Sequence, residues 1–166
     1  MQAASRDALE QSRTSLESTL AADPAGGATG AKVGAELFEV VDVLEENRQL
    51  RVAVADTAAT AEARQDLVRG VFGWKIAQPT LDVVLAAVSR DWSTPRELRE
   101  GLVLLGREAL MRSAETQGQL QTVEDELFRL GRIVAGDPEF EQKLSDRTAP
   151  AEARRANTEL RRAMRA

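Results

Sequence analysis

The sequence contains no cysteine and no histidine, and these absences exclude several classes of site. Without cysteine, neither a disulfide nor a zinc–thiolate centre can form. Without histidine, the chain lacks the commonest metal ligand, the base of the usual catalytic triads and the side chain that most often exchanges protons near neutral pH. These absences weaken the case for an enzyme and leave only a carboxylate-based site in a helical bundle as a catalytic alternative, so we expect no cofactor and no metal.

Aromatic residues are also scarce, at 4% of the chain, although hydrophobic residues make up 43%. The core must then consist mainly of leucine, valine and alanine, which suit closely packed helices better than a sheet. The 166 residues have room for one domain, or for one domain and part of a second. We predict an all-α fold.

Charge and hydropathy exclude two kinds of partner. Acidic residues outnumber basic residues by 27 to 22 and the signs are mixed, so no basic stripe indicates nucleic-acid binding. No apolar run approaches the roughly 20 residues that cross a bilayer, and residues 1–10 lack the apolar core of a signal peptide. We expect a cytoplasmic chain with no direct membrane insertion. The basic last segment fits a solvated helix face better than a contact with lipid or nucleic acid.

The first two helices are predicted on either side of a linker. Residues 5–21 place Leu9, Leu16 and Leu20 on one narrow apolar stripe. Residues 22–30 contain a proline and three glycines, which oppose regular structure, and we predict a flexible linker there. Apolar residues return at helical spacing over residues 31–46, where we predict the second helix.

Three shorter helices follow. Asn47 can cap a short third helix, and a fourth begins at Ala61 and ends near Gly73, where glycine can adopt the left-handed conformation that closes a helix. Pro79 can occupy the first turn of a fifth helix, which is the most hydrophobic of the set. Its apolar face consists of Leu81, Val84, Leu85 and Val88.

A sixth helix starts at a capping box that begins with Thr94. The helical rhythm then continues without proline, so we predict one long helix to about Ala135. Gly106 and Gly118 each cost about 1 kcal/mol relative to alanine inside a helix. Residues 112–119 are polar all round, and a break there is the alternative.

A weak internal repeat appears when the sequence is shifted by ninety positions. Residues 36–38 then fall on residues 126–128 with the same Glu-Leu-Phe, and residues 61–64 fall on residues 151–154 with the same Ala-Glu-Ala-Arg. We interpret this as a recurrence of helices two to four. Chance similarity between helices rich in alanine and glutamate is the alternative. We therefore predict a six-helix bundle over residues 1–110, and a helical extension over residues 111–166 that holds an incomplete second copy.

Several motifs occur in a characteristic order. Residues 36–44 read ELFEVVDVL and are followed at 47–51 by NRQLR; residues 64–75 read RQDLVRGVFGWK, with PTL at 79–81 and AVSRDWS at 87–93. In order and spacing these motifs resemble the ATP synthase delta family over about residues 34–107. The stretch after Met111 resembles the duplicated segment of actinobacterial delta subunits and of mycobacterial b-delta fusions. The first helix is more polar, and the linker longer, than the family pattern.

The resemblance implies a role in an F-type ATP synthase. In this family, which includes the oligomycin-sensitivity-conferring protein, a six-helix N-terminal domain sits on the catalytic head and binds the N-terminal helices of alpha subunits. A C-terminal region joins the b subunit. Such a peripheral-stalk, or stator, subunit holds the head against rotor torque during proton-driven ATP synthesis and is itself not catalytic. Its expected location is the cytoplasmic face of the plasma membrane, as a peripheral part of the complex.

The same resemblance implies that an alpha-subunit helix lies in a groove between the first and fifth helices. The residues expected to form this groove are Leu9, Leu16, Leu20, Leu81, Val84, Leu85 and Val88. Some of these side chains must instead hold the bundle together, because two apolar faces of a bundle serve as core and as docking surface alike. The alternative function is an unrelated helical adaptor or coiled-coil regulatory module, which the same composition and periodicity also fit.

Overall fold

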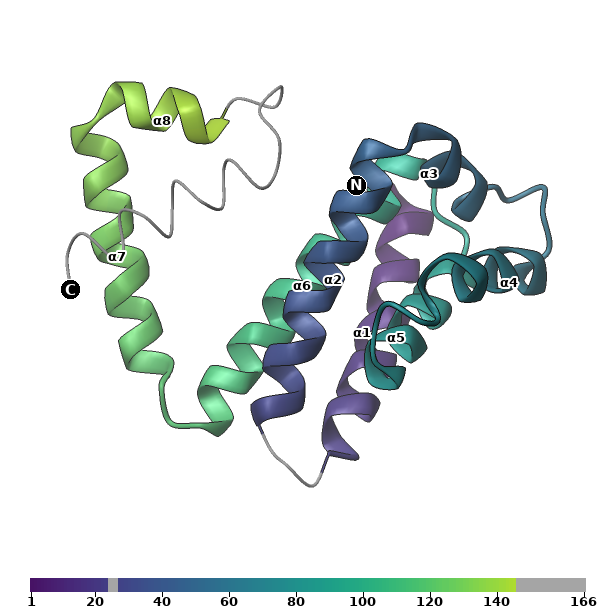
Figure 1. Cartoon of the computed structure of the whole chain (residues 1–166), viewed down its shortest axis with the longest axis horizontal. Coiled ribbons are helices and arrows are strands. Elements are labelled where there is room, and N and C mark those ends of the chain that lie inside the picture. Colours follow the sequence, from purple (N-terminus) through teal and green to yellow (C-terminus); the bar gives the residue numbers. More distant parts are fainter. Residues whose placement is uncertain (24–26, 146–166) are drawn as a thin grey trace. The chain divides into compact units, whose positions relative to one another are not determined.

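The computed structural model describes residues 1–23 and 27–145, and every regular element in those two ranges is an α-helix. The predicted all-α fold is therefore confirmed. The helices are α1 (Ala3–Ala21), α2 (Gly27–Glu46), α3 (Arg48–Val54), α4 (Ala61–Phe72), α5 (Gln78–Val88), α6 (Pro95–Thr116), α7 (Leu120–Gly136) and α8 (Pro138–Ser145) (Figure 1). The chain divides into two compact units, Met1–Leu120 and Gln121–Ala166.

The first unit is organised around the pair α2 and α6, which lie side by side and form its most extensive helix contact (Figure 1). Helix α1 packs against both α5 and α6, and α4 packs against α5. Among the described residues, the largest fully buried side chains are leucines and valines together with Phe72, and Ala87 and Ala109 are fully buried as well, in agreement with a core of leucine, valine and alanine. Burial of such apolar side chains stabilises the unit by roughly 1.5–3 kcal/mol each.

The predicted linker is shorter than expected, because α2 begins at Gly27. Gly27, Gly30 and Gly34 lie in this helix and face α6. A Cβ atom on Gly34 would lie 2.6 Å from the Leu110 side chain, and one on Gly27 would lie 2.8 Å from the Ser113 carbonyl oxygen. The Ser113 hydroxyl also donates a hydrogen bond to the Gly27 carbonyl. The close contact with α6 thus offsets the poor helix propensity of glycine, which local composition alone cannot show.

The predicted helix starts are confirmed by their caps. The side chains of Asn47, Thr60 and Thr94 each accept a hydrogen bond from the backbone amide three residues on, at 3.1 Å in each case. Pro79 lies in the first turn of α5. The predicted closure of α4 is wrong in detail, because Gly73 has a right-handed φ of −57°. Its amide bonds to the Arg69 carbonyl and simply continues the helical pattern.

The predicted long helix to Ala135 is wrong. Helix α6 ends at Thr116, and Gly118 has a φ of +68°, which is the only positive φ among the described residues. The Gly118 amide donates to the Glu115 carbonyl, and the Gln119 amide donates to the Ala114 carbonyl. These two bonds form a Schellman motif, for which a residue without Cβ is best suited. The break named as the alternative is the one observed, and the first unit extends beyond the predicted boundary at residue 110.

The second unit supports the internal repeat. Helix α7 ends ninety positions after the end of α2, and α8 begins ninety positions after the start of α3. The caps correspond as well: Asn47 Oδ1 accepts from the Leu50 amide at 3.1 Å, and Asp137 Oδ1 accepts from the Phe140 amide at 3.0 Å. Both Leu50 and Phe140 are buried. The counterpart of α4 falls on residues 151–154, which lie outside the described residues.

Candidate partner-binding site

The seven predicted partner-binding residues lie where α1 and α5 meet. Helices α1 and α5 pack directly against one another, and six of the seven side chains are buried, whereas Leu20 is only partly buried. The two stripes therefore contribute to the hydrophobic core and do not flank an open groove. Gln78 and Asp82 are the exposed residues of α5. The participation of the seven residues in partner binding stays a prediction.

A carboxylate on α6 holds the start of α1. Glu97 Oε2 accepts a hydrogen bond from the Ser5 hydroxyl at 2.6 Å, and its Oε1 accepts from the Gln2 amide at 2.8 Å. The Ser5 hydroxyl in turn accepts from the Ser93 amide at 2.8 Å. The hydrogen bond from Ser5 is the main cause that lowers the pKa of Glu97. The predicted capping box is thus half correct: Thr94 caps α6, but Glu97 bonds to α1.

A buried arginine from the family-like motifs joins two loops of the bundle. Arg64 is almost fully buried, and its Nε donates to the Val88 carbonyl at 2.7 Å at the end of α5. Its other donors bind the carbonyl oxygens of Asp56, Ala59 and Ser89 and a carboxylate oxygen of Asp91. The guanidinium has five donors in a planar fork and can satisfy several carbonyls at once, which lysine cannot.

Other residues of these motifs also hold helix ends. Helix α5 has no capping side chain of its own, and Glu36 Oε2 on α2 accepts from the amide of Ala77, the residue before the helix, at 2.9 Å. Arg51 donates to the Leu44 carbonyl at the end of α2, at 2.9 Å. The motif residues named here therefore act on the fold, by satisfying backbone groups that helix ends leave open.

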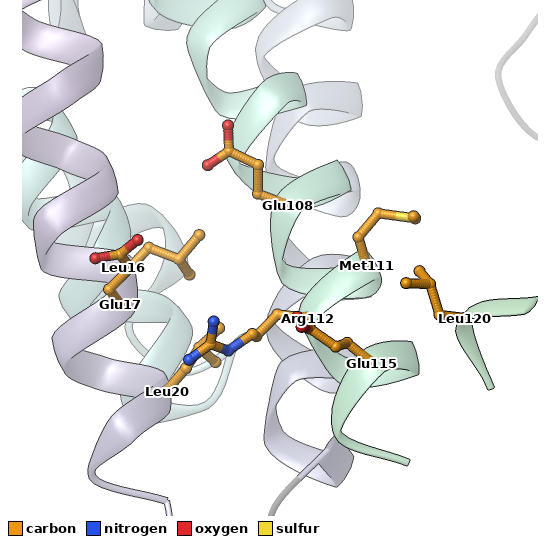
Figure 2. A pocket seen from close by; sticks show the side chains of 8 residues that line it. All are labelled: Leu16, Glu17, Leu20, Glu108, Met111, Arg112, Glu115 and Leu120. Atoms are coloured by element: carbon orange, nitrogen blue, oxygen red, sulfur yellow. The ribbon is translucent and has the colours of Figure 1, made fainter. Parts of the chain in front are cut away.

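A shallow hollow of about 270 Å³ lies between α1 and the second half of α6 (Figure 2). Its apolar lining is Leu16, Leu20, Met111 and Leu120, and its charged rim is Glu17, Glu108, Arg112 and Glu115. Arg13 bridges the two helices beside it, 2.7 Å from Glu108, and this hydrogen bond raises the pKa of Arg13. The volume is below the roughly 300–1,000 Å³ of small-molecule sites, so the hollow fits a protein side chain better than a ligand.

Two further findings concern the described residues only. Residues 1–23 and 27–145 contain no cluster of three or more acidic, histidine or cysteine side chains that could hold a metal ion. Within the same ranges, no helix combines the length and the apolar character required to cross a bilayer.

Sequence reasoning missed two features of the first unit, one buried and one exposed. Periodicity could not show that Glu97 binds α1, because the two groups are far apart in the sequence. It also gave no role to Trp74, whose side chain is 78% exposed. The position of Trp74 between Gly73 and Lys75, next to the end of a predicted helix, was the available signal for a turn.

Comparisons with known proteins agree with the family resemblance that the ordered motifs indicate. No family model matches the chain. Over 93% of its length, however, it is 55% identical to a protein of Rhodococcus opacus, 53% identical to one of Corynebacterium efficiens and 48% identical to one of Corynebacterium jeikeium. All three are named ATP synthase subunit delta. The chain is homologous to ATP synthase delta subunits.

The resemblance to the delta family that the ordered motifs indicate is thereby confirmed. The chain spans only 56–57% of the length of these delta subunits. The identity extends well beyond residues 34–107, because the aligned segments cover 155–157 residues.

Proposed function

We propose that this chain is part of a non-catalytic peripheral-stalk subunit of an F-type ATP synthase. The observation that carries the proposal is the 55% identity, over 93% of the chain, to a protein named ATP synthase subunit delta. The absence of histidine and cysteine from the sequence also favours a structural role over catalysis. In this role the chain is a peripheral part of the complex at the cytoplasmic face of the plasma membrane, and it contributes to proton-driven ATP synthesis without transferring a proton.

A subunit that resists torque has to be stiff, and the contacts of the first unit support stiffness. Helices α2 and α6 approach closely at Gly27 and Gly34, where no space is left for a side chain. Arg64 and Glu36 hold the two ends of α5 through hydrogen bonds to backbone groups. Packed helices with satisfied ends deform little under load, because core packing is dense and its rearrangement is costly.

In the proposed complex, an N-terminal helix of an alpha subunit lies along the outer edges of α1 and α5, and the b subunit binds a different region of the parent protein. The buried apolar faces of α1 and α5 pack against one another beneath this surface and hold it in place. Leu81 and Leu85 keep a small exposed area, and Asp82 is exposed beside them on α5. A helix with apolar residues at i, i+3 and i+4 can contact such an edge.

Titration calorimetry with a peptide of the alpha-subunit N-terminus from the same organism tests this proposal. Substitutions at the buried Leu16 or Val84 would damage the fold, so the test uses the exposed Asp82 on α5. We expect Asp82→Arg to change binding by about tenfold, because it reverses a charge in the proposed contact, and the sign of the change reports the charge of the helix that lies there. The matched control is Glu39→Arg, an exposed position on α2, which we expect to leave binding unchanged.

Co-purification with ATP synthase subunits distinguishes a wrong function from a wrong binding site. If the chain retains no ATP synthase subunit and does not bind the peptide, the proposed function is wrong and a free helical adaptor is the better interpretation. If the peptide binds and Asp82→Arg has no effect, the function stands and the α1–α5 edge is not the site.

A further inference from the structure

Helix α7 has an apolar face that is not buried. The side chains of this face recur at alternating spacings of four and three residues: Val123, Leu127, Leu130 and Val134. No residue of α7, which the structure describes from end to end, is buried, and Leu127 and Phe128 are more than half exposed. Amphipathic helices owe most of their stability to the packing of such a face, so it is a candidate contact with another helix.

Helix α2 shows how the same pattern is covered elsewhere in the chain. The residues ninety positions before the apolar face of α7 are Val33, Leu37, Val40 and Leu44, and all four are buried. The helix in most extensive contact with α2 is α6. The buried stripe of α6 includes Leu98, Leu102, Leu105 and Ala109, which are all fully buried. The cover observed for this pattern is therefore a helix with apolar residues at i, i+4, i+7 and i+11.

The correspondence between α2 and α7 includes the helix boundaries as well as the apolar spacing. Helix α7 ends ninety positions after α2, and the residue that caps the next helix is Asp137 where the first unit has Asn47. The cap is followed by a buried side chain at the same distance in both cases, Phe140 and Leu50. Any amphipathic helix can share the apolar spacing, but the helix end, the cap and the buried residue need not agree as well. The cover of α2 is therefore a guide to the cover of α7.

The edges of the apolar face indicate the charge of its cover. Glu124 and Glu126 lie at these edges, and the other edge residues, Gly131 and Ile133, carry no charge. Two copies of α7 would bring these glutamates together with no basic edge residue to pair with them. The 17 residues of α7 also hold little more than two heptads, whereas three to four are typical of a coiled coil. A second copy is thus a poorer occupant than a helix with basic residues beside its apolar stripe.

We propose that another helix of the same polypeptide, which follows α8 in the parent protein, covers the apolar face of α7. This helix carries the apolar stripe of α6 and basic residues at its edges, and it lies about ninety positions after α6 if the repeat continues. The delta subunits that the chain matches have room for it, because the aligned segments cover only 56–57% of their length. The inference concerns the fold of the parent protein and does not rest on the proposed function.

Cysteine labelling tests the proposal, because the sequence contains no cysteine and an introduced thiol reports the exposure of its own position. Leu127→Cys is compared in the 166-residue chain and in the parent protein expressed from its whole gene. We expect a maleimide to label Leu127→Cys about tenfold more slowly in the parent protein, because the covered thiol reacts only when the helix contact opens.

The matched control is Arg129→Cys, on the opposite side of α7. Arg129 is exposed, as is Glu39, which lies ninety positions earlier on α2. We expect Arg129→Cys to react at the same rate in the 166-residue chain and in the parent protein. Amide exchange in α7 of the unsubstituted proteins gives a second measurement that does not depend on a substitution, and it should be slower in the parent protein.

Four outcomes would overturn the proposal. Equal labelling of Leu127→Cys in both proteins would show that the face stays open, and a gene without a helix after α8 would remove the occupant. Labelling of the 166-residue chain that slows as its concentration rises would identify a second copy as the cover. Protection that appears only when other ATP synthase subunits are added would identify a partner subunit. The first three outcomes leave the proposed function standing, and the fourth supports it.

Discussion

Helices α2 and α7 carry the same pattern but differ in burial. Leu37 on α2 is fully buried, whereas Leu127, ninety positions later on α7, is 56% exposed. Phe38 is half-buried and packs near Gly106 on α6, whereas Phe128 is 69% exposed. The pattern is therefore sufficient to specify an amphipathic helix and its apolar face, but a partner helix such as α6 is needed to bury that face.

The two helices also differ in how closely another helix can approach them. The glycines that permit the contact of α2 with α6 are Gly27, Gly30 and Gly34. The residues ninety positions later are Gln117, Leu120 and Glu124. The residues ninety positions later keep the cap between two helices but not the small residues, so a helix that packed on α7 could not approach it as closely as α6 approaches α2.

The largest expected difference concerns the two leucines. Leu37→Ala should lower the free energy of unfolding by about 3 kcal/mol, because it leaves a cavity in a dense core. Leu127→Ala should change it by less than about 0.5 kcal/mol, as for an exposed residue. Urea unfolding followed by circular dichroism measures both variants. Equal effects would mean that α7 is buried to the same extent as α2.

Glycine-to-alanine substitutions on α2 and α7 should change stability in opposite directions. Gly34→Ala should destabilise the first unit by about 2 kcal/mol, because the new methyl group would overlap Leu110 and the Gly106 carbonyl. Gly131→Ala, at a position with no neighbour within 4 Å, should stabilise α7 by about 1 kcal/mol through helix propensity. Thermal unfolding reports the first change and amide exchange in α7 reports the second. A stabilising Gly34→Ala would contradict the close approach of α2 and α6.

Removal of either of the two corresponding caps should destabilise the helix that follows it by a similar amount. The effect on the stability of the first unit should differ. Asn47→Ala and Asp137→Ala each remove a bond to the first turn of the following helix, which is worth about 1 kcal/mol. Asn47→Ala should lower the stability of the whole first unit, because α3 contacts α2, α4 and α6. Asp137→Ala should accelerate amide exchange in α8 and leave the main transition unchanged. If Asp137→Ala also shifts or abolishes the main unfolding transition, the two units unfold together.

The pH dependence of stability should arise in part from Glu97. Its pKa is lower in the folded chain than in the unfolded chain, so its stabilisation is present above the unfolded value of about 4.3 and is lost as the pH falls through the folded value. Glu97→Gln should remove this part of the acid sensitivity. The measurement is the free energy of unfolding of both chains between pH 6 and pH 3. Parallel curves would show that Glu97 is not responsible.

Much of the fold was predictable from the sequence because its signals are local. A helix start depends on a side chain and an amide three residues away, and Asn47, Thr60 and Thr94 could each be recognised from their neighbours. The apolar spacing of α1 and α5 likewise identified the faces that carry Leu16 and Val84. It could not separate core from docking surface, because both require the same stripe of apolar side chains.

By itself, the sequence determined the helical class of this protein, most of its helix starts and the delta-family resemblance, since these depend on spacing along the chain. Only the tertiary structure decided that Gly27 begins a helix, that Glu97 holds α1, and that Leu37 is buried while Leu127 is exposed. Each of these outcomes depends on atoms that lie far apart in the sequence and meet only after folding. The free energy of a close helix contact or of a buried carboxylate depends on these non-local contacts, so a local sequence pattern cannot predict it.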